Sequence, residues 1–242
     1  MNAWGLTDKG VVRAQNQDAF YLQVKHEDNQ AILAVCDGMG GARAGDVASR
    51  LALDTFVGEV GRTLKPGMDT EAIKRTLSFA AALANEAVYV KAEAAEYTGM
   101  GTTLVGAAVS GSQAVVINVG DSRAYRIAGG IARVTRDHSL VEDLLSTGDL
   151  TEQEARSHPS KNLLTRALGT DLWVDCDLYA LDMAPGEFLV LCSDGLTNVV
   201  EDQEILYEVL HGGDTAEACT RLVRLACERG GPDNVTVALI AV

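Results

Sequence analysis

Apolar residues occur along the chain in runs of strand length that are gathered into blocks. The run at 31–36 is apolar at almost every position, which is typical of a strand buried on both faces. Turns at Gly111 and near Gly120 separate the runs of the middle block. The predicted strands are 19–24, 31–36, 103–109, 114–119, 123–127, 173–181, 188–192 and 235–242.

Between these blocks the apolar residues recur at helical spacing. A Pro-Gly pair separates the first two helical stripes, and two more stripes precede the last strand. The patterns Ser139-x-x-Glu142 and Thr151-x-x-Glu154 resemble capping boxes and predict a short helical insert. The predicted helices cover residues 53–64, 73–88, 205–210 and 219–227.

The order of these elements predicts an α+β fold. A strand block, a helix pair, a second strand block, a second helix pair and a last strand suggest antiparallel sheets covered by helical layers. No repeat, low-complexity tract or linker divides the 242 residues, and this length suits one compact domain or at most two small ones.

Charge narrows the range of partners. The chain has 20 basic and 34 acidic residues, a net charge of −14, so nucleic acid and anionic membranes are poor partners. A phosphate-bearing substrate would need a local reversal of that charge.

Cysteine usage and the first residues indicate a cellular compartment. Five scattered cysteines without a Cys-x-x-Cys pair favour reduced thiols over disulfides or a zinc site. The first residues lack the basic and apolar regions of a signal peptide. The uncharged stretch 97–120 is broken at Ser110-Gly111-Ser112, which predicts a turn between strands, not a membrane-spanning helix. We therefore expect a soluble, cytoplasmic protein without membrane insertion.

Four aspartates lie at the ends of predicted apolar strands. Asp37, Asp121 and Asp194 each follow such a run, and Asp233 precedes the last one. Carboxylates brought to one rim of a sheet repel one another and lose solvation, and a divalent cation relieves both costs. An all-oxygen set suits Mg²⁺ or Mn²⁺ better than zinc. For any one of these residues alone, a simple Asp-Gly turn is the better interpretation, and only the four together favour a metal site.

Two neighbouring features add to this interpretation. The glycines after Asp37 and Asp194 free the backbone to turn, so that a carbonyl oxygen can join a cation's ligands. Arg13 lies just before the first predicted strand, and a guanidinium can grip a phosphate through two hydrogen bonds. Taken alone, Arg13 is better interpreted as a surface charge than as a phosphate ligand.

Other hydrolase and nucleotide-binding motifs are absent from the sequence. No cysteine has an arginine six positions later, which excludes the thiolate phosphatase loop. The sequence also has no Gly-x-Ser-x-Gly elbow, no phosphate-binding P-loop and no His-Glu-x-x-His. Cys36 and Cys192 flank two of the aspartates, and we expect them to be small buried hydrophobic residues, not redox sensors.

Seven short motifs in order closely resemble the bacterial branch of the metal-dependent protein phosphatase 2C family. Each motif alone is weak, but together they span essentially the whole chain. They are Arg13-x-x-Asn16-Gln17-Asp18, Asp37-Gly38-Met39-Gly40-Gly41, Met100-Gly101-Thr102-Thr103, Gly120-Asp121-Ser122-Arg123, Asp137-His138-Ser139, Ser193-Asp194-Gly195-Leu196 and Asp233-Asn234.

This resemblance implies a four-layer α/β/β/α sandwich in which helix pairs flank a central antiparallel β-sandwich. It also implies two Mn²⁺ or Mg²⁺ ions at one end of that sandwich. By family likeness Asp37 bridges both ions, Gly38 contributes its carbonyl oxygen, and Asp194 and Asp233 complete the second site. Asp18 would act through metal-bound water.

Further roles follow from the same resemblance. Asp121, together with Asp194, matches the position of a third, weaker ion, and Arg13 matches the phosphate-binding arginine. The expected catalytic residues are therefore Arg13, Asp37 and Asp194. Residues 1–242 would form one catalytic domain, with a flap at about 144–168 that influences substrate choice.

The implied reaction is hydrolysis of phosphoserine and phosphothreonine in proteins. A hydroxide bridging the two ions would attack phosphorus in line with the leaving oxygen, while Arg13 and the cations neutralise charge on the equatorial oxygens. The alternatives are a catalytically weak or inactive phosphoprotein-binding domain of the same fold and a hydrolase of small phosphate esters. The implied partners are phosphorylated proteins and a membrane-anchored serine/threonine kinase, and a monomer is expected because no apolar stripe is left unused.

One position departs from the family pattern. Many bacterial relatives have histidine directly after the second glycine of Asp-Gly-Met-Gly-Gly, where it is assigned to protonate the leaving group, but this chain has Ala42 followed by Arg43. Water or another group would then supply the proton, or the enzyme would be slow on poor leaving groups. His138 is a weaker candidate, for which a structural role is favoured. We expect turnover to depend more steeply on leaving-group pKa than in relatives with the histidine.

Overall fold

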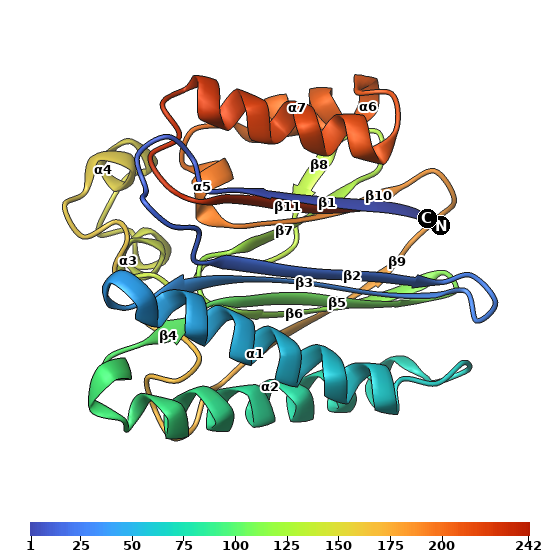
Figure 1. Cartoon of the computed structure of the whole chain (residues 1–242). Coiled ribbons are helices and arrows are strands. Elements are labelled where there is room, and N and C mark those ends of the chain that lie inside the picture. Colours follow the sequence, from blue (N-terminus) through green and yellow to red (C-terminus); the bar gives the residue numbers. More distant parts are fainter.

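Two antiparallel sheets lie face to face in the computed structural model, which describes the backbone of residues 1–242 and every side chain except those of Ala42, Arg43, Glu152, Arg156 and Ser157 (Figure 1). The first sheet has the order β2-β3-β5-β6-β9, with β4 paired to the end of β3, and the second has the order β1-β11-β10-β7-β8. The strands of the first sheet are β2 (Asp18–Lys25), β3 (Gln30–Met39), β4 (Gly101–Thr102), β5 (Leu104–Ser110), β6 (Gln113–Val119) and β9 (Asp177–Asp182). Those of the second are β1 (Asn2–Asp8), β7 (Arg123–Ile127), β8 (Ile131–Arg133), β10 (Phe188–Cys192) and β11 (Val235–Ala241).

Helix pairs cover the outer faces of both sheets. Helices α1 (Gly41–Thr63) and α2 (Thr70–Ala92) pack on the first sheet, and α6 (Asp202–His211) and α7 (Thr215–Glu228) pack on the second (Figure 1). The short helices η1 (Ala95–Tyr97) and α5 (Asp194–Thr197) connect these layers to the strands. The predicted α+β, four-layer α/β/β/α sandwich is thus confirmed.

Strand β3 shows why the inner strands are continuously apolar. Ile32, Ala34 and Cys36 pack toward α1 and α2, whereas Leu33 and Val35 pack toward the second sheet. Because both faces of the strand are covered, no position between residues 31 and 36 can be polar without burying an unpaired group. This packing carries Asp37 to the end of the sandwich on a rigid strand.

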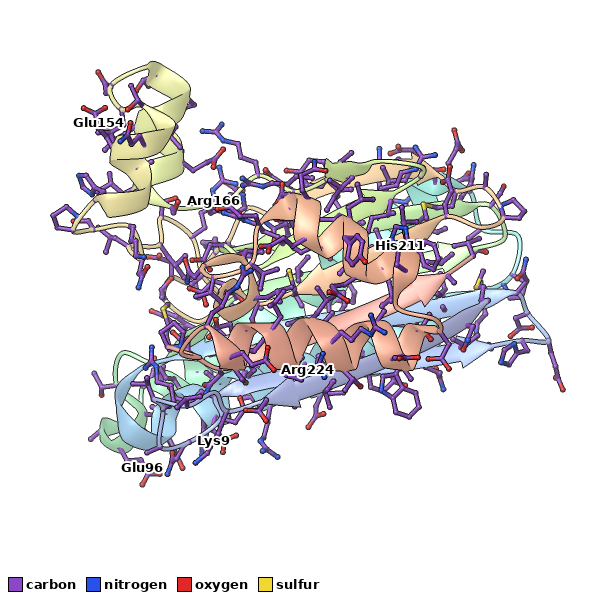
Figure 2. All side chains as sticks on the ribbon, turned by 90° about the horizontal axis from the view of Figure 1, so that it is seen from above. Lys9, Glu96, Glu154, Arg166, His211 and Arg224 are labelled. Carbon is purple, nitrogen blue, oxygen red and sulfur yellow. The ribbon has the colours of Figure 1, made fainter. Side chains whose placement is uncertain are left out.

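The helical insert lies at the same end of the sandwich. Helices α3 (Leu140–Thr147) and α4 (Glu152–Ser157) project beyond the sheets, and Glu154 on α4 stands well away from the body (Figure 2). Both predicted caps are present: Ser139 Oγ accepts the Glu142 N–H at 3.3 Å, and Thr151 forms a complete capping box. After α4, residue 164 pairs with residue 139 and residue 168 pairs with residue 102, so the insert returns to the edge of the first sheet.

The structure corrects the predicted strand at 173–181. Strand β9 begins at Asp177, and residues 169–176 instead form an irregular segment along α2. The buried Asn85 of α2 holds this segment: it donates to the carbonyl oxygens of Asp171 at 3.0 Å and Leu172 at 3.2 Å, and accepts the Gly169 N–H at 2.8 Å. Trp173 is 84% exposed, so the apolar run there did not indicate burial.

Strand β1 was missed in the sequence because it is an edge strand. Its residues are exposed or half-buried, and Gly5 interrupts its apolar pattern. Among the described residues, no helix is both long enough and apolar enough to cross a bilayer.

Candidate metal centre

Asp18 and Asp37 lie opposite each other at one end of the first sheet. They are cross-strand partners at the start of β2 and near the end of β3. The backbone of Asp37 is held by two threonines: its N–H donates to Thr103 Oγ1 at 2.9 Å, and its carbonyl oxygen accepts from Thr102 Oγ1 at 2.9 Å. The antiparallel register thus brings these two carboxylates together.

The second sheet and a turn bring the other aspartates to the same end. Asp194 is the first residue of α5, directly after β10; Asp233 lies two residues before β11; and Asp121 lies in the turn between β6 and β7. A cavity of about 550 Å³ opens there. Its lining includes Arg13, Asp37, Gly38, Asp121, Asp194 and Asp233, whereas Asp18 lies beneath it and is only 5% exposed.

Two glycines allow the backbone to pack tightly beside Asp37. A Cβ on Gly38 would collide with the carbonyl oxygen of Gly45 in the first turns of α1, and the Gly38 N–H donates to the Gln17 carbonyl oxygen at 3.1 Å. A Cβ on Gly195, the residue after Asp194, would collide with the Asn234 carbonyl oxygen. Glycine is therefore required at both positions by close backbone approach.

The carboxyl groups are electrostatically unfavourable as they stand. Burial, reinforced by neighbouring aspartates, raises the pKa of Asp18 to about 7 and that of Asp121 to about 8. The same causes raise the pKa of Asp37 and of Asp194. The cluster is thus a concentration of partly buried carboxyl groups whose ionised forms are destabilised.

Two carboxylate oxygens of the aspartate cluster have no hydrogen-bond donor among the described residues. Within the described part of the chain, the buried Asp18 Oδ1 and Asp194 Oδ1 accept no hydrogen bond. Their sister oxygens are bonded, because Asp18 Oδ2 accepts from two hydroxyls and Asp194 Oδ2 accepts from Asn198 Nδ2 at 2.9 Å. Orphaned anionic oxygens beside a polar cavity point to a cationic ligand.

The carboxylates share the cavity wall without closing around one point. Among the described residues, no three carboxylate, imidazole or thiol groups already converge closely enough to hold an ion. Mutual repulsion favours such separation. A cation that binds in the cavity therefore has to draw the carboxylates inward.

Arg13 lies on the rim of the cavity and is paired with Asp233. Its Nη2 atom is 2.6 Å from Asp233 Oδ2, and about half of the Arg13 side chain is exposed. The loop that carries it is fixed by the buried Asn234, whose Nδ2 donates to the carbonyl oxygens of Lys9 and Gln15, both at 2.9 Å, and whose Oδ1 accepts the Gln17 N–H at 2.8 Å. Asn234 therefore ties the arginine loop to the start of β11.

The candidate proton donor His138 does not reach the cavity. His138 is buried outside the cavity lining: its Nδ1 accepts the Gly120 N–H at 3.2 Å and its Nε2 lies 3.2 Å from Asp177 Oδ2. With both ring nitrogens occupied and its pKa lowered by burial, His138 has the structural role that was favoured. The side chain of Ala42 is outside the described side chains.

Several supporting residues were not identified from the sequence. Asn162 and Leu164, from the end of the insert, line the cavity, and Ser193 and Thr236 bind Asp18. Ser193 belongs to one of the family motifs, but the sequence gives none of these residues its role, because these roles depend on contacts between distant segments. Cys36 and Cys192 are fully buried, as expected, and burial raises the pKa of the Cys192 thiol to about 12.

Comparisons with known proteins agree with one another. The sequence pattern of the family described as protein phosphatase 2C matches residues 11–230. The serine/threonine phosphatase stp of Listeria monocytogenes is 40% identical over 243 residues, an alignment covering 99% of this chain and 95% of that protein.

Solved structures give the same result. The serine/threonine phosphatase of S. agalactiae superimposes with a TM-score of 0.92 at 33% identity, covering 100% of this chain and 99% of that one. The catalytic domain of the serine/threonine protein phosphatase PstP, solved in complex with two manganese ions, superimposes with a TM-score of 0.85 at 34% identity, covering 98% and 96% of the two chains.

Proposed function

The chain belongs to the protein phosphatase 2C family, and we propose that it hydrolyses phosphoserine and phosphothreonine in proteins with Mn²⁺ or Mg²⁺ in the aspartate-lined cavity. The observation that carries this proposal is the group of desolvated carboxylates at the cavity, where Arg13 contacts Asp233 but no described basic side chain pairs with Asp37 or Asp194. A binding module has no need of carboxylates that repel one another, whereas a cation-dependent hydrolase needs them as metal ligands.

The residues present fit hard divalent cations. The donors are all oxygen atoms, and two of them lack a hydrogen bond within the described residues. We propose that Asp37, the Gly38 carbonyl oxygen, Asp194 and Asp233 hold two ions, as family members do, and that Asp121 and Asp194 hold a third, weaker one. Divalent cations bound there would lower the pKa of nearby water and so supply hydroxide near neutral pH.

Arg13 would orient the substrate. Its half-exposed guanidinium lies on the rim of the cavity and can exchange its contact with Asp233 for two phosphate oxygens. A chain with a net charge of −14 repels phosphate esters, and Arg13 and the bound cations reverse that field locally. Asp18, behind the cavity, would hold water in place for in-line attack on phosphorus.

Protonation of the leaving oxygen is the step for which this chain lacks the usual family residue. With Ala42 at that position and His138 engaged elsewhere, we propose that water protonates the serine or threonine oxygen. Turnover should then fall steeply as leaving-group pKa rises across a series of aryl phosphates. Ala42→His should flatten this dependence and accelerate phosphothreonine hydrolysis about tenfold, a modest share of what general acids contribute. A flat dependence in the wild type, or no change in Ala42→His, would contradict this.

The inactive binding-domain alternative has little support. Only Ala42 favours it, whereas Asp37, Asp121, Asp194 and Asp233 are all present and relatives of this chain are named as phosphatases.

The cellular setting is also a proposal. We propose that residues 1–242 act as one cytoplasmic, monomeric catalytic domain with a flap at about 144–168. Its substrates would be phosphoproteins, including those of a membrane-anchored serine/threonine kinase. Asn162 and Leu164 in the cavity lining support a role of the flap at the substrate site.

The direct test is hydrolysis of a phosphothreonine peptide by the purified chain with Mn²⁺, with Mg²⁺ and with excess chelator. Turnover that requires metal would support the proposal. Metal uptake without turnover on the peptide would favour the inactive binding domain, and turnover on small esters alone would favour a small-molecule hydrolase.

A further inference from the structure

A closed ring of hydrogen bonds beneath Asp18 joins the two sheets. Thr7 of β1 and Thr236 of β11 are direct cross-strand partners, and their hydroxyl oxygens are 2.7 Å apart. Thr236 Oγ1 donates to Asp18 Oδ2 at 2.7 Å, and Asn16 Nδ2 donates to Thr7 Oγ1 at 2.9 Å. The Asp18 N–H closes the ring by donating to Asn16 Oδ1 at 3.1 Å.

The chemistry of these groups determines which atom donates in each hydrogen bond of the ring. A hydroxyl has one proton to donate, and that of Thr236 is committed to the Asp18 carboxylate. Thr7 must therefore donate to Thr236, and it can do so because it accepts from an amide N–H of Asn16, which can only donate. The side-chain hydrogen bonds therefore run from Asn16 through Thr7 and Thr236 to the Asp18 carboxylate, and each bond strengthens the next by polarisation.

The consequence is that the two oxygens of Asp18 differ. Oδ2 accepts from Thr236 and from Ser193 Oγ at 2.8 Å, whereas Oδ1 accepts from no described residue and is buried. Ser193 is itself held, because its Oγ accepts the Thr236 N–H at 3.0 Å. The carboxylate plane is thereby fixed, with Oδ1 as its one available acceptor.

We propose that Thr7 is a positioning residue for divalent cation binding. It acts through Thr236 on the orientation of Asp18, although Thr7 itself is not among the residues that line the cavity. This inference rests on the proposed function, since it requires that the cavity binds cations. Groups that orient a metal site from outside its ligands typically change metal affinity by 10- to 100-fold.

A purely architectural role does not account for the hydroxyl of Thr7. Thr7 is a half-buried residue in an edge strand, where valine has the same shape and a higher strand propensity. A residue selected for packing alone could be valine. The hydroxyl matters because it accepts from Asn16 and supplies Thr236 with a donor.

The experiment measures Mn²⁺ affinity by titration calorimetry for the full chain, Thr7→Val, Thr7→Ser and Thr7→Ala, with unfolding in chelator measured in parallel. We expect Thr7→Val to weaken Mn²⁺ binding about tenfold and Thr7→Ser to bind as the wild type does. Thr55→Val is the matched control, because Thr55 Oγ1 donates to the Leu51 carbonyl oxygen in the middle of α1, far from the cavity. It should not change Mn²⁺ affinity.

The outcomes separate the inference from the proposed function. Wild-type Mn²⁺ uptake with unchanged affinity in Thr7→Val would overturn this inference alone. A wild-type chain that takes up no Mn²⁺ would overturn both. If Thr7→Val does not fold, Thr7→Ser and Thr7→Ala differ by the hydroxyl alone, and equal affinities in those two variants would overturn the inference. A general packing role would lower stability in chelator without changing affinity.

Discussion

Two acidic sites among the described residues differ in how their charge is compensated. Asp137 is buried, and its carboxylate accepts from Arg123 Nη2 at 2.7 Å and lies 2.8 Å from Arg133 Nη2. The carboxylates around Asp37 have no such partner, except that Asp233 contacts Arg13. Both sites come from motifs of the same family pattern. The chain supplies the counter-charge at one of them, and an external cation has to supply it at the other.

The difference shows why a motif residue is not necessarily catalytic. Arg123 and Asp137 form a satisfied pair that holds β7 against the segment after β8. Asp121 lies two residues from Arg123, yet its pKa is raised to about 8 by burial and by Asp194. Loss of solvation is common to both sites, so it does not by itself identify the functional site. The absence of a basic partner for Asp37 among the described residues identifies it.

The largest expected effect comes from Asp37→Asn. Removing this carboxylate should lower metal-dependent turnover of a phosphothreonine peptide by 1,000-fold or more, about 4 kcal/mol in transition-state stabilisation. Stability in chelator should not fall, because a repulsive buried charge is removed. Steady-state kinetics and urea unfolding of the same preparation test both parts. If Asp37→Asn lost as much stability in chelator as Asp137→Asn does, the proposed difference between the two sites would be contradicted.

Asp137→Asn should have the opposite effect. Leaving Arg123 and Arg133 without their carboxylate should cost about 3 kcal/mol of unfolding free energy, the lower end for a broken buried pair because both arginines are about one-quarter exposed. Urea unfolding measures this. Asp143→Asn is the control, since its pair with Arg136 is exposed and should contribute less than about 1 kcal/mol. A loss for Asp137→Asn no larger than that of the control would be the contrary result.

Arg13→Ala tests the arginine that lines the cation site among the described side chains. We expect kcat/KM for the phosphothreonine peptide to fall about 30-fold, roughly 2 kcal/mol, because a charged hydrogen-bond donor to phosphate is lost. Stability should change little, since the Arg13–Asp233 pair is half-exposed. If Arg13→Ala instead destabilised the chain and left kcat/KM unchanged, this arginine would resemble Arg123.

The pH dependence of stability should also distinguish the two sites. Burial raises the pKa of Asp18 to about 7 and of Asp121 to about 8, so the folded chain retains protons that the unfolded chain releases near pH 4. In chelator, the contribution of these two carboxyl groups to the free energy of unfolding should therefore be largest below pH 4. That contribution should be lost as the pH rises from about 4 to about 8.

This appears as a Tm that falls by several degrees from pH 5 to pH 8 in chelator. With saturating Mn²⁺ the fall should disappear, because the cation stabilises the ionised carboxylates. Asp121→Asn should flatten the chelator curve. Parallel curves with and without Mn²⁺ would contradict the assignment.

The sequence predicted the fold and the location of the site well because both depend on patterns along the chain. The apolar strand at 31–36 indicated burial on both faces, and the aspartates at strand ends indicated convergence at one rim. The predicted start of β9 was wrong because the exposed Trp173 extends the apolar pattern of a strand. The path of the chain there is determined by Asn85, which lies 84 residues before Gly169 in the sequence. Thr7 and Thr236 could not have been found, since only the β1–β11 register makes them neighbours.

The most direct test of the central claim is anomalous diffraction from crystals of the chain grown with Mn²⁺. The account predicts anomalous peaks in the cavity between Asp37, Asp194 and Asp233, and none at Asp137. Absence of a peak in the cavity at saturating Mn²⁺, or a peak bound only elsewhere, would contradict it.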